Sequence, residues 1–411
     1  MDDGPMATGE VSLFLTGDSV ITRPWSHVRE ESFLRLIEVV RAADVSVTNL
    51  ETVIHEFNGF AQADCGGSYM TSPPQIAAEL KWAGFDMFAH ANNHCFDYGS
   101  TGILETISHV ESAGLVLAGS GRDLQNARAP RYVRRKGRVV ALVAMATDFI
   151  PYGKASYARS DVAGRPGLNP LRVSGGKPAI IVTERMRRRL EPLARIGLRL
   201  RTGNHLGIRW GFEIDPDHLE GNLKAISEAA SKADIVVASV HAHRQGPWLQ
   251  KIARHSIERG ASLVFIHGPH EIRGIEIFNG RPVFYAMSDF VFEPEYIARF
   301  PAEAYEKRGL PPDAVLDETT RAKLASPLLR NRKSFEAFAA LIGFTGTEVA
   351  RIGLIPLDLQ FDAIGESRGR PQLASPQLGR EIIGRLATRS KRFGTRIVYD
   401  ADSNRGEVAL G

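Results

Sequence analysis

The chain alternates short apolar runs with stretches in which apolar residues recur every three or four positions. The short runs predict β-strands, and the recurring pattern predicts amphipathic helices. A strand–helix alternation of this kind predicts a layered α/β body. We expect strands over residues 11–17, 44–51, 85–91, 138–146, 233–241, 261–268 and 282–290, and helices over residues 31–43, 73–84 and 100–114.

Two segments break this alternation. Residues 147–220 contain GRPGLNPLR and the Arg-rich run ERMRRRLEPLARIGLRLR, and they predict an insertion over one sheet edge. Residues 296–340 are rich in charge and proline and predict a second insertion or a lid. The tail, residues 341–411, should pack on the main domain and add strands at an edge. The expected main domain therefore spans residues 10–295.

The composition is that of a globular protein with an excess of arginine. The 411 residues carry a net charge of +4, and the pI is about 9.0, which favours carboxylate-bearing partners over nucleic acid. The two cysteines, Cys65 and Cys95, cannot form a disulfide framework and suit a reducing compartment. No apolar run approaches the roughly 20 residues of a membrane helix. We expect a cytoplasmic protein without a membrane or nucleic-acid partner.

Polar side chains gather where the expected strands end. The segment HANNHCFDYG, residues 90–99, carries two Asn, two His and one Asp directly after an apolar stretch. In open α/β sheets, functional groups collect outside the carboxyl ends of the strands. Oxygen and imidazole ligands without thiolates suit a hard or borderline divalent ion, so these strand ends predict a metal site. They supply Asp18, Asn49, Glu51, Asn92, Asn93, His94, Asp97, His241, His243, His267, His270, Glu276 and Asp289.

Some of these residues also have purely structural explanations. Asn92 could hydrogen-bond its own loop, and Asp97 could stabilise the N-terminus of the following helix. His90 and His109 fit packing or surface roles. Unpaired polar groups at strand ends are costly unless something binds them, so a structural explanation fails for one set taken together. That set is Asp18, Glu51, Asn93, His94 and His243.

The motifs resemble those of a known family. GDS, NLE, ANNHCFDYGSTGILET, LAGSG, GRPGLNPL and HGPHEIRGIEIFNGRPVFYAMSDFVFE are similar to blocks of the CapA-type family of poly-γ-glutamate capsule synthesis. The resemblance covers residues 10–295. It implies a calcineurin-like, metallophosphoesterase-related fold, a four-layer α/β/β/α sandwich with a metal site at one end of its sheets. Carried over residue by residue, it places around that site Asp18, Glu51, Asn93, His94, His241, His243, His267 and His270.

The sequence also departs from the pattern that the resemblance implies. Phosphoesterases of this fold usually open with Asp-x-His, whereas Val20 stands two positions after Asp18, which counts against a full dinuclear site. The family's usual Gly-Asn-Phe is Ser288-Asp289-Phe290 here, which places an extra carboxylate beside the site. Family members are normally membrane-anchored or exported, and we find neither signal in this sequence.

These features lead us to expect a metal-dependent enzyme that uses His and Asp for acid–base catalysis. The most specific activity that we expect is epimerisation at the α carbon of a peptide residue. The resemblance implies this activity, because a soluble branch similar to this family includes epimerases that act on lasso-peptide precursors. The expected catalytic residues, with acid and base not yet assigned, are His94, Asp97, His243 and Asp289. The expected ligands of a divalent ion (Ca, Mg, Mn or Zn) are Asp18, Glu51, Asn93, His241, His267 and His270. No organic cofactor is expected.

The expected substrate is a peptide or another carboxylate-bearing molecule. Arg23, Trp25 and Trp248 are candidate substrate-binding residues, and Tyr152 and Trp210 could also hold a substrate side chain. The Arg-rich insertion could bind the carboxylate of the peptide. Two alternatives remain open: phosphoester hydrolysis at the same metal site, and non-catalytic handling of an anionic polymer such as poly-γ-glutamate.

Overall fold

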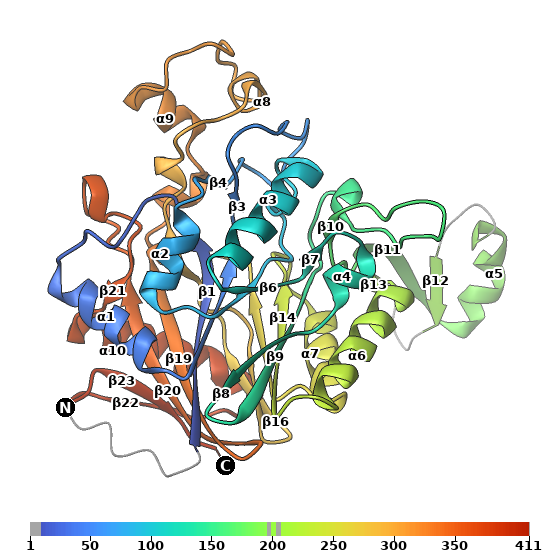
Figure 1. Ribbon diagram of the computed structural model, residues 1–411. Helices are drawn as coiled ribbons and strands as arrows, with labels where there is room; N and C mark the ends of the chain where they lie inside the picture. The colour runs from blue at the N-terminus through green and yellow to red at the C-terminus, as the bar shows by residue number, and fades with distance from the viewer. Residues whose placement is uncertain (1–9, 195–198, 203–206, 411) are drawn as a thin grey trace.

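Two β-sheets packed face to face form the centre of the protein. The computed structural model describes residues 10–194, 199–202 and 207–410, and Figure 1 shows the arrangement. The first sheet has the order β22 (Ile397–Asp400), β23 (Arg405–Val408), β20 (Glu348–Asp358), β19 (Glu336–Thr345), β1 (Glu10–Val20), β2 (Val45–Leu50), β5 (Met87–Ala89), β6 (Val116–Ala118), with β18 (Asp289–Phe292) beside β1 and β21 (Gln372–Leu373) beside β20. The second has the order β16 (Ile275–Phe278), β17 (Arg281–Phe284), β15 (Leu263–His267), β14 (Ile235–His241), β9 (Arg138–Ala146), β8 (Arg131–Arg135).

Helices cover both sheets on the outside. Helices α1 (Glu31–Ala42), α2 (Ile76–Ala83) and α3 (Gly99–Ser112) lie on the first sheet, and α6 (Pro216–Ala230) and α7 (Pro247–Glu258) lie on the second. Helix α10 (Pro376–Ser390) packs against β20, β22 and the edge strand β16. The prediction of a four-layer α/β/β/α sandwich is therefore confirmed.

The sequence pattern of β9 explains the layering. Side chains of a strand alternate between the two faces of its sheet. Val140, Leu142 and Ala144 accordingly belong to the core between the sheets, whereas Val143 and Met145 belong to the core under α6 and α7. A strand that is apolar on both faces is typical of a parallel sheet covered on both sides.

The parallel strands of both sheets end at one edge of the sandwich. Strands β1, β2, β5 and β6 run parallel in the first sheet, and β9, β14 and β15 run parallel in the second. Close contact of β1 and β18 at this edge requires Gly17, because a Cβ there would lie 1.8 Å from the carbonyl oxygen of Ser288. Polar residues after these strands are thus delivered to one place.

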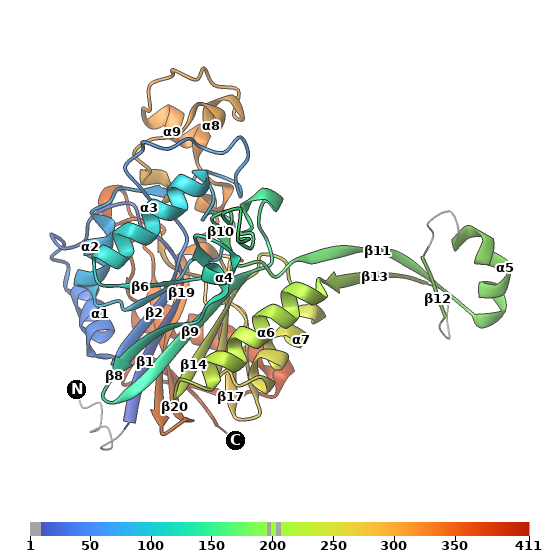
Figure 2. The same cartoon turned by 45° about the vertical axis from the view of Figure 1, so that its right-hand side comes forward.

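The insertion predicted within residues 147–220 forms a projecting arm. Strands β11 (Val173–Val182), β12 (Arg199–Thr202) and β13 (Gly207–Ile214) make a separate small sheet, and α5 (Glu184–Ala194) caps its far end. Figure 2 shows the arm extending away from the sandwich. The described part of the Arg-rich run, on α5 and β12, therefore lies at the tip of the arm, away from the edge where the polar strand ends meet, and the expectation that it holds the substrate carboxylate is corrected.

The C-terminal tail adds strands at one edge of the first sheet, as predicted, where β22, β23 and β20 lie in this order. Strand β19 begins at Glu336 and pairs antiparallel with β1, next to the middle of the first sheet. The segment before it carries α8 (Ala302–Glu306) and α9 (Glu318–Leu324). Tyr305 and Leu324 of these helices pack on Tyr69 and Tyr98. The expected boundary at residues 340/341 thus falls inside β19.

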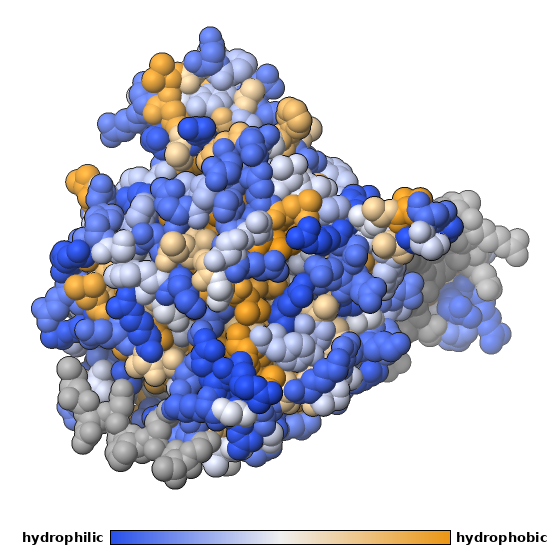
Figure 3. All heavy atoms as spheres, viewed as in Figure 1, coloured by the Kyte–Doolittle hydropathy of each residue, from blue (hydrophilic) through white to orange (hydrophobic). Residues whose placement is uncertain are grey.

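The remaining elements are short. Strands β3 (Val53–Ile54) and β4 (Thr71–Ser72) form one two-stranded sheet, and β7 (Ser120–Gly121) and β10 (Gly167–Leu168) form another, with α4 (Leu124–Arg128) beside β7. The face in Figure 3 is mainly hydrophilic, with small hydrophobic patches. Within the described ranges, every helix falls short of the length and apolar character needed to cross a membrane.

Candidate metal centre

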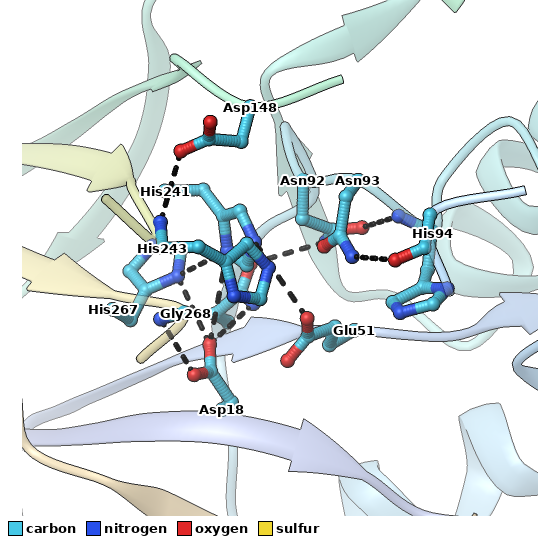
Figure 4. Close-up of polar contacts among 12 residues, drawn as sticks. Asp18, Glu51, Asn92, Asn93, His94, Asp148, His241, His243, His267 and Gly268 are labelled. Carbon is cyan, nitrogen blue, oxygen red and sulfur yellow. Dashed lines mark hydrogen bonds and ion pairs between the residues drawn. The ribbon is translucent and has the colours of Figure 1, made fainter. Parts of the chain in front are cut away.

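Asp18 is the centre of a buried polar cluster at this edge. It lies at an irregularity in β1, where the pairing with β2 and β18 shifts register. Its Oδ1 lies 3.0 Å from Nδ1 of His267 and accepts a 2.7 Å hydrogen bond from the Asn49 amide, while its Oδ2 accepts a 2.8 Å bond from the backbone N–H of Gly268 (Figure 4). Three contacts from β2 and the end of β15 therefore fix this carboxylate in one orientation.

Three histidines form a chain beside Asp18. Nδ1 of His241 lies 3.0 Å from Nδ1 of His267, and Nε2 of His241 lies 3.1 Å from Nε2 of His243. Ser239 contacts the far ring nitrogen of His267 at 2.8 Å. Imidazole nitrogens at this separation must share a proton or face a common cation. The spacing His-x-His after β14 thus brings both rings to one site, as the strand pattern predicts.

Two further carboxylates complete the cluster. Glu51 follows β2, and its Oε1 lies 3.6 Å from Nε2 of His241. Asp289 opens β18 and contacts Nδ1 of His270 at 2.8 Å. Neither oxygen of Glu51, nor Oδ2 of Asp289, has a hydrogen-bond partner within the described part of the chain, although all are buried.

Buried carboxylate oxygens without partners are costly, and a bound cation removes that cost. The donor set of carboxylate oxygens and imidazole nitrogens fits a divalent ion of the hard or borderline class. Three overlapping groups bring their ligand atoms within 4.8 Å of one another: Asp18, His241 and His267; Glu51, His243 and His270; Asp18, Glu51, His270 and Asp289. A buried cluster that could bind a metal ion is therefore present, as the strand ends predict.

Burial and mutual charge shift the pKa values of the cluster in opposite directions. Burial raises the pKa of Glu51 well above its usual value, and the negative charge of Asp18 raises it further. Burial opposes the ionisation of Asp18, but the charge and hydrogen bond of His267 lower its pKa overall. Burial and the charge of His270 lower the pKa of His243 to about 4. Without a cation, these pKa shifts favour a protonated Glu51 carboxyl, an ionised Asp18 and an uncharged His243.

His94 and Asp97 form a pair next to the cluster. Nδ1 of His94 lies 2.9 Å from Oδ2 of Asp97, which also accepts a 2.8 Å hydrogen bond from the backbone N–H of Met70. Burial raises the pKa of Asp97. In Figure 4, Glu51 lies between His94 and the histidines of β14 and β15. Because Nδ1 is committed to Asp97, Nε2 of His94 is the nitrogen left to exchange a proton.

The two asparagines of HANNHCFDYG have different roles. Asn92 donates to the carbonyl oxygen of Leu50 at 2.8 Å and accepts from the backbone N–H of His94 at 3.1 Å, so it ties the loop to itself. Asn93 donates to the carbonyl oxygen of Gly66, but its buried Oδ1 has no partner within the described ranges. The unpartnered oxygen of Asn93 is thus available as a ligand atom, as the resemblance implies.

Three residues at the site have positive φ angles. Gly268, which donates to Asp18, has φ +110, and a Cβ there would lie 3.1 Å from the ring of His241. His270 has φ +51 and Ser288 has φ +65, which is unusual for residues other than glycine. Strained backbone of this kind persists where surrounding contacts hold it and is common at functional sites.

Two of the three expected substrate-binding residues are core residues instead. Trp25 is 1% exposed and packs edge-on against Phe33 and Phe290, and Trp248 is 5% exposed in the core under α7. Their rings are not accessible to a substrate, so that expectation is corrected. Arg23 pairs with Glu293 at 3.0 Å, and its role stays a prediction.

The other expected substrate contacts and one strand-end carboxylate lie as follows. Tyr152 is 42% exposed. The side chain of Trp210 falls outside the described residues. Glu276 lies away from the cluster, where it accepts hydrogen bonds from Arg254 and from the hydroxyl of Tyr285 at 2.6 Å. Glu276 is therefore a structural residue.

The sequence patterns missed Asp148. Its Oδ2 accepts a 3.0 Å hydrogen bond from the backbone N–H of His243, and its Oδ1 accepts a 2.9 Å bond from Nε of Arg244 (Figure 4). The side chain therefore positions the second histidine of the His-x-His pair. The signal was present, because Thr147-Asp148 directly follows the apolar run of β9, as the other polar clusters follow theirs.

Comparison with known proteins identifies the family. Residues 12–294 match the family model described as bacterial capsule synthesis protein PGA_cap. The uncharacterized protein y4sH of Sinorhizobium fredii is 31% identical, with 97% of this chain and 94% of that protein covered. The PGA biosynthesis protein CapA of Bacillus subtilis is 24% identical, with 69% of this chain and 63% of that protein covered.

A solved structure, that of a hypothetical protein from Thermus thermophilus, is also similar. It has a TM-score of 0.42 and 13% sequence identity, with 85% of this chain and 99% of that chain covered. The family model covers well over half of the sequence, and the match between y4sH and this chain extends almost from end to end of both proteins. The resemblance to the CapA-type family is confirmed, and the chain belongs to the bacterial capsule synthesis PGA_cap family.

Proposed function

We propose that the protein is a metal-dependent enzyme that transfers protons at a carboxylate-bearing peptide substrate. One observation carries this proposal. The carboxylates of Glu51 and Asp289 are buried without enough partners, and a histidine held by its own carboxylate, His94 with Asp97, lies beside them. The first feature favours a bound cation, and the second is the usual construction of a general acid or base.

The sharpest form of the proposal is inversion at a peptide α carbon. When bound, a divalent ion would stabilise negative charge that develops on the substrate carbonyl oxygen. Asp18, Glu51, His241 and His267 would hold it, with Asn93 and His270 as further ligands. His94 and His243 come from different sheets, and they would exchange protons with the α carbon from two sides.

Proton balance then constrains the two imidazoles. One removes the α proton while the other, protonated, delivers a proton to the opposite face, so no oxidant or reductant is needed. The hydrogen bond to Asp97 holds Nε2 of His94 ready for this exchange. Asp148 fixes the position of His243 by accepting a hydrogen bond from the backbone N–H of His243. The carboxyl group of Asp289, next to His270, could return the transferred proton.

Phosphoester hydrolysis is the second candidate, because the same groups can serve it. His94, fixed by Asp97, could protonate a leaving oxygen, and a cation held by the cluster would supply activation of the attacking water. The absence of a His two positions after Asp18 counts against it, since Val20 is a buried apolar side chain and offers no ligand. Handling of an anionic polymer is favoured by membership of the bacterial capsule synthesis family and by the name of its relative, the PGA biosynthesis protein CapA.

Incubation in deuterated water separates these functions. The metal-loaded protein is given a set of carboxylate-bearing peptides and, separately, an aryl phosphate. Deuterium at an α carbon of an intact peptide, lost in His94→Gln, supports the proposal. Phosphate release without deuterium exchange supports the second candidate instead. Inertness in both reactions, with retained binding of a glutamate polymer, would overturn the enzymatic proposal.

A further inference from the structure

A second polar cavity lies next to the candidate metal centre. Its volume is about 260 Å³, near the lower limit of the roughly 300–1,000 Å³ typical of ligand pockets, so it suits one side chain or the end of a peptide. The wall facing the histidines consists of Thr147 and Asp148. Both are hydrogen-bonded to the β14 segment, Thr147 to the carbonyl oxygen of His241 at 2.9 Å and Asp148 to the backbone N–H of His243 at 3.0 Å.

The opposite parts of the wall are positively charged. Lys154, Arg172 and Arg244 line the cavity, and Asp148 is the single carboxylate among the lining residues. Arg244 is committed, with Nε on Asp148 at 2.9 Å and Nη2 on the carbonyl oxygen of Val173 at 2.7 Å. Three cations against one carboxylate leave the lining with a net charge of +2.

The other two cations are free to bind an anion. Within the described ranges, neither the ammonium group of Lys154 nor the guanidinium group of Arg172 takes part in a hydrogen bond or ion pair. Lys154 is half-buried. Both lie close enough to His218 to act on its charge: burial lowers the pKa of His218, and these two cations lower it further, against Asp215.

We propose that this cavity is the substrate carboxylate site, in which Lys154 and Arg172 bind a carboxylate of the peptide while Arg244 and Asp148 form its fixed wall. Arginine and lysine pair with carboxylates through charge-assisted hydrogen bonds, and arginine can do so with two bonds at once. Asp148 belongs to both places, because one of its oxygens holds Arg244 in the cavity wall and the other holds His243 at the centre. The cavity therefore fixes a substrate relative to an imidazole of the site.

The cavity also replaces the Arg-rich insertion as the origin of carboxylate specificity. The part of that run that forms α5 lies at the tip of the arm. Arg172 lies instead at the base of the arm, directly before β11, and Lys154 lies in the loop after β9. The inference rests on the proposed function for its view that the bound carboxylate belongs to a substrate.

Binding of labelled peptides tests the site without requiring turnover. The probes are fluorescein-labelled pentaglutamate, pentaglutamate with an amidated C-terminus, and pentaglutamine with a free C-terminus, titrated by fluorescence anisotropy in EDTA and in excess Mn²⁺. We expect Lys154→Gln and Arg172→Gln each to weaken pentaglutamate binding roughly tenfold, the typical loss of one charge-assisted bond. Arg330→Gln, a change of an exposed arginine on another part of the surface, should leave binding unchanged.

The probes also tell which carboxylate is bound. Loss of binding on C-terminal amidation identifies the main-chain carboxylate, and loss with pentaglutamine identifies a side-chain carboxylate; either result supports the site. Equal binding of all three probes would overturn it. So would equal losses in Arg330→Gln and Arg172→Gln, because these would show binding to surface charge in general.

Failure of this inference can be told from failure of the proposed function. If Lys154 and Arg172 control pentaglutamate binding but no peptide exchanges an α proton, the cavity stands and the proton-transfer function falls. If peptides exchange their α protons equally well in Lys154→Gln, Arg172→Gln and the unaltered protein, the function stands and the carboxylate site falls.

Discussion

Replacing Glu51 by Gln should stabilise the metal-free protein and remove most of the stabilisation that metal provides. Glu51 is buried, neither of its oxygens has a hydrogen-bond partner in the described part of the chain, and its ligand atom lies within 4.8 Å of those of Asp18 and Asp289. Two unit charges 4.8 Å apart repel by about 3 kcal/mol at an effective dielectric constant of about 20. Glutamine keeps the shape of the side chain and removes the charge.

The sign of the effect without metal follows from the pKa of Glu51. Its folded pKa lies well above the usual 4.5, so the carboxyl costs stability as the pH rises above 4.5, until the folded pKa is reached. At pH 7 the cost cannot exceed the free energy of a pKa shift from 4.5 to 7, about 3 kcal/mol, because a carboxyl that is still protonated at pH 7 adds no further cost. Metal-free Glu51→Gln should therefore be more stable by up to about 3 kcal/mol, or roughly 3–4 °C in Tm for a chain of this length.

The same substitution should reduce the stabilisation that the protein gains from metal. If the cation is present at about 1,000 times its Kd, it stabilises the unaltered protein by about 4 kcal/mol. Removing a buried charged ligand costs about 3 kcal/mol, equivalent to a loss of affinity of roughly 100-fold. At the same cation concentration, the stabilisation of Glu51→Gln then falls to about 1.4 kcal/mol.

Thermal unfolding in EDTA and in Mn²⁺ measures both effects. Glu276→Gln is the matched control, because Glu276 is equally buried but satisfied by Arg254 and Tyr285. It should lower Tm by a similar amount in both conditions and leave the shift with metal unchanged. A Glu51→Gln protein that is less stable in EDTA, or that gains as much Tm from Mn²⁺ as the unaltered protein, would refute the reasoning.

Three further results are expected. His94→Gln and Asp97→Asn should each lower turnover by about 100-fold or more, as loss of a general acid or base does, while metal content by elemental analysis stays the same; loss of metal would show that the pair is structural. Gly17→Ala should lower stability by at least about 1–3 kcal/mol in denaturant unfolding, because its Cβ would lie 1.8 Å from the carbonyl oxygen of Ser288; unchanged stability would show that β18 shifts freely. Burial raises the pKa of Asp289 to about 6, so loss of this negative charge beside the centre should lower cation affinity in calorimetry by up to tenfold for each pH unit below about 6, and a constant affinity there would show that the Asp289 carboxylate does not stabilise the bound cation.

Much of the site could be predicted from the sequence because parallel strands end at one edge of a sheet. The residues after β1, β2, β14 and β15 meet for this reason, and no knowledge of strand order was required. The segment HANNHCFDYG is rich in polar residues for two reasons. Asn92 holds the loop together, and His94 with Asp97 faces the cluster. The pattern of polar residues at strand ends thus predicted the position of the site better than the role of each residue.

The sequence patterns were weakest where three-dimensional packing decides. Trp25 and Trp248 have the character of substrate-binding residues, but an aromatic side chain is equally suited to a core, and only packing shows which side it faces. The position of β19 beside β1 depends on pairing across more than 300 residues, which local patterns do not specify. The Arg-rich helix was assigned to the site by charge alone, whereas the length of β11 and β13 carries it away.

Anomalous diffraction from crystals grown with Mn²⁺ is the most direct test of the cation site. A peak is expected among the side chains of Asp18, Glu51, His241 and His267, in contact with at least two of them, and it should weaken or vanish in Asp18→Asn. A crystal that binds Mn²⁺ only elsewhere, with these four side chains in the same arrangement, would contradict the assignment of the cluster as a metal centre.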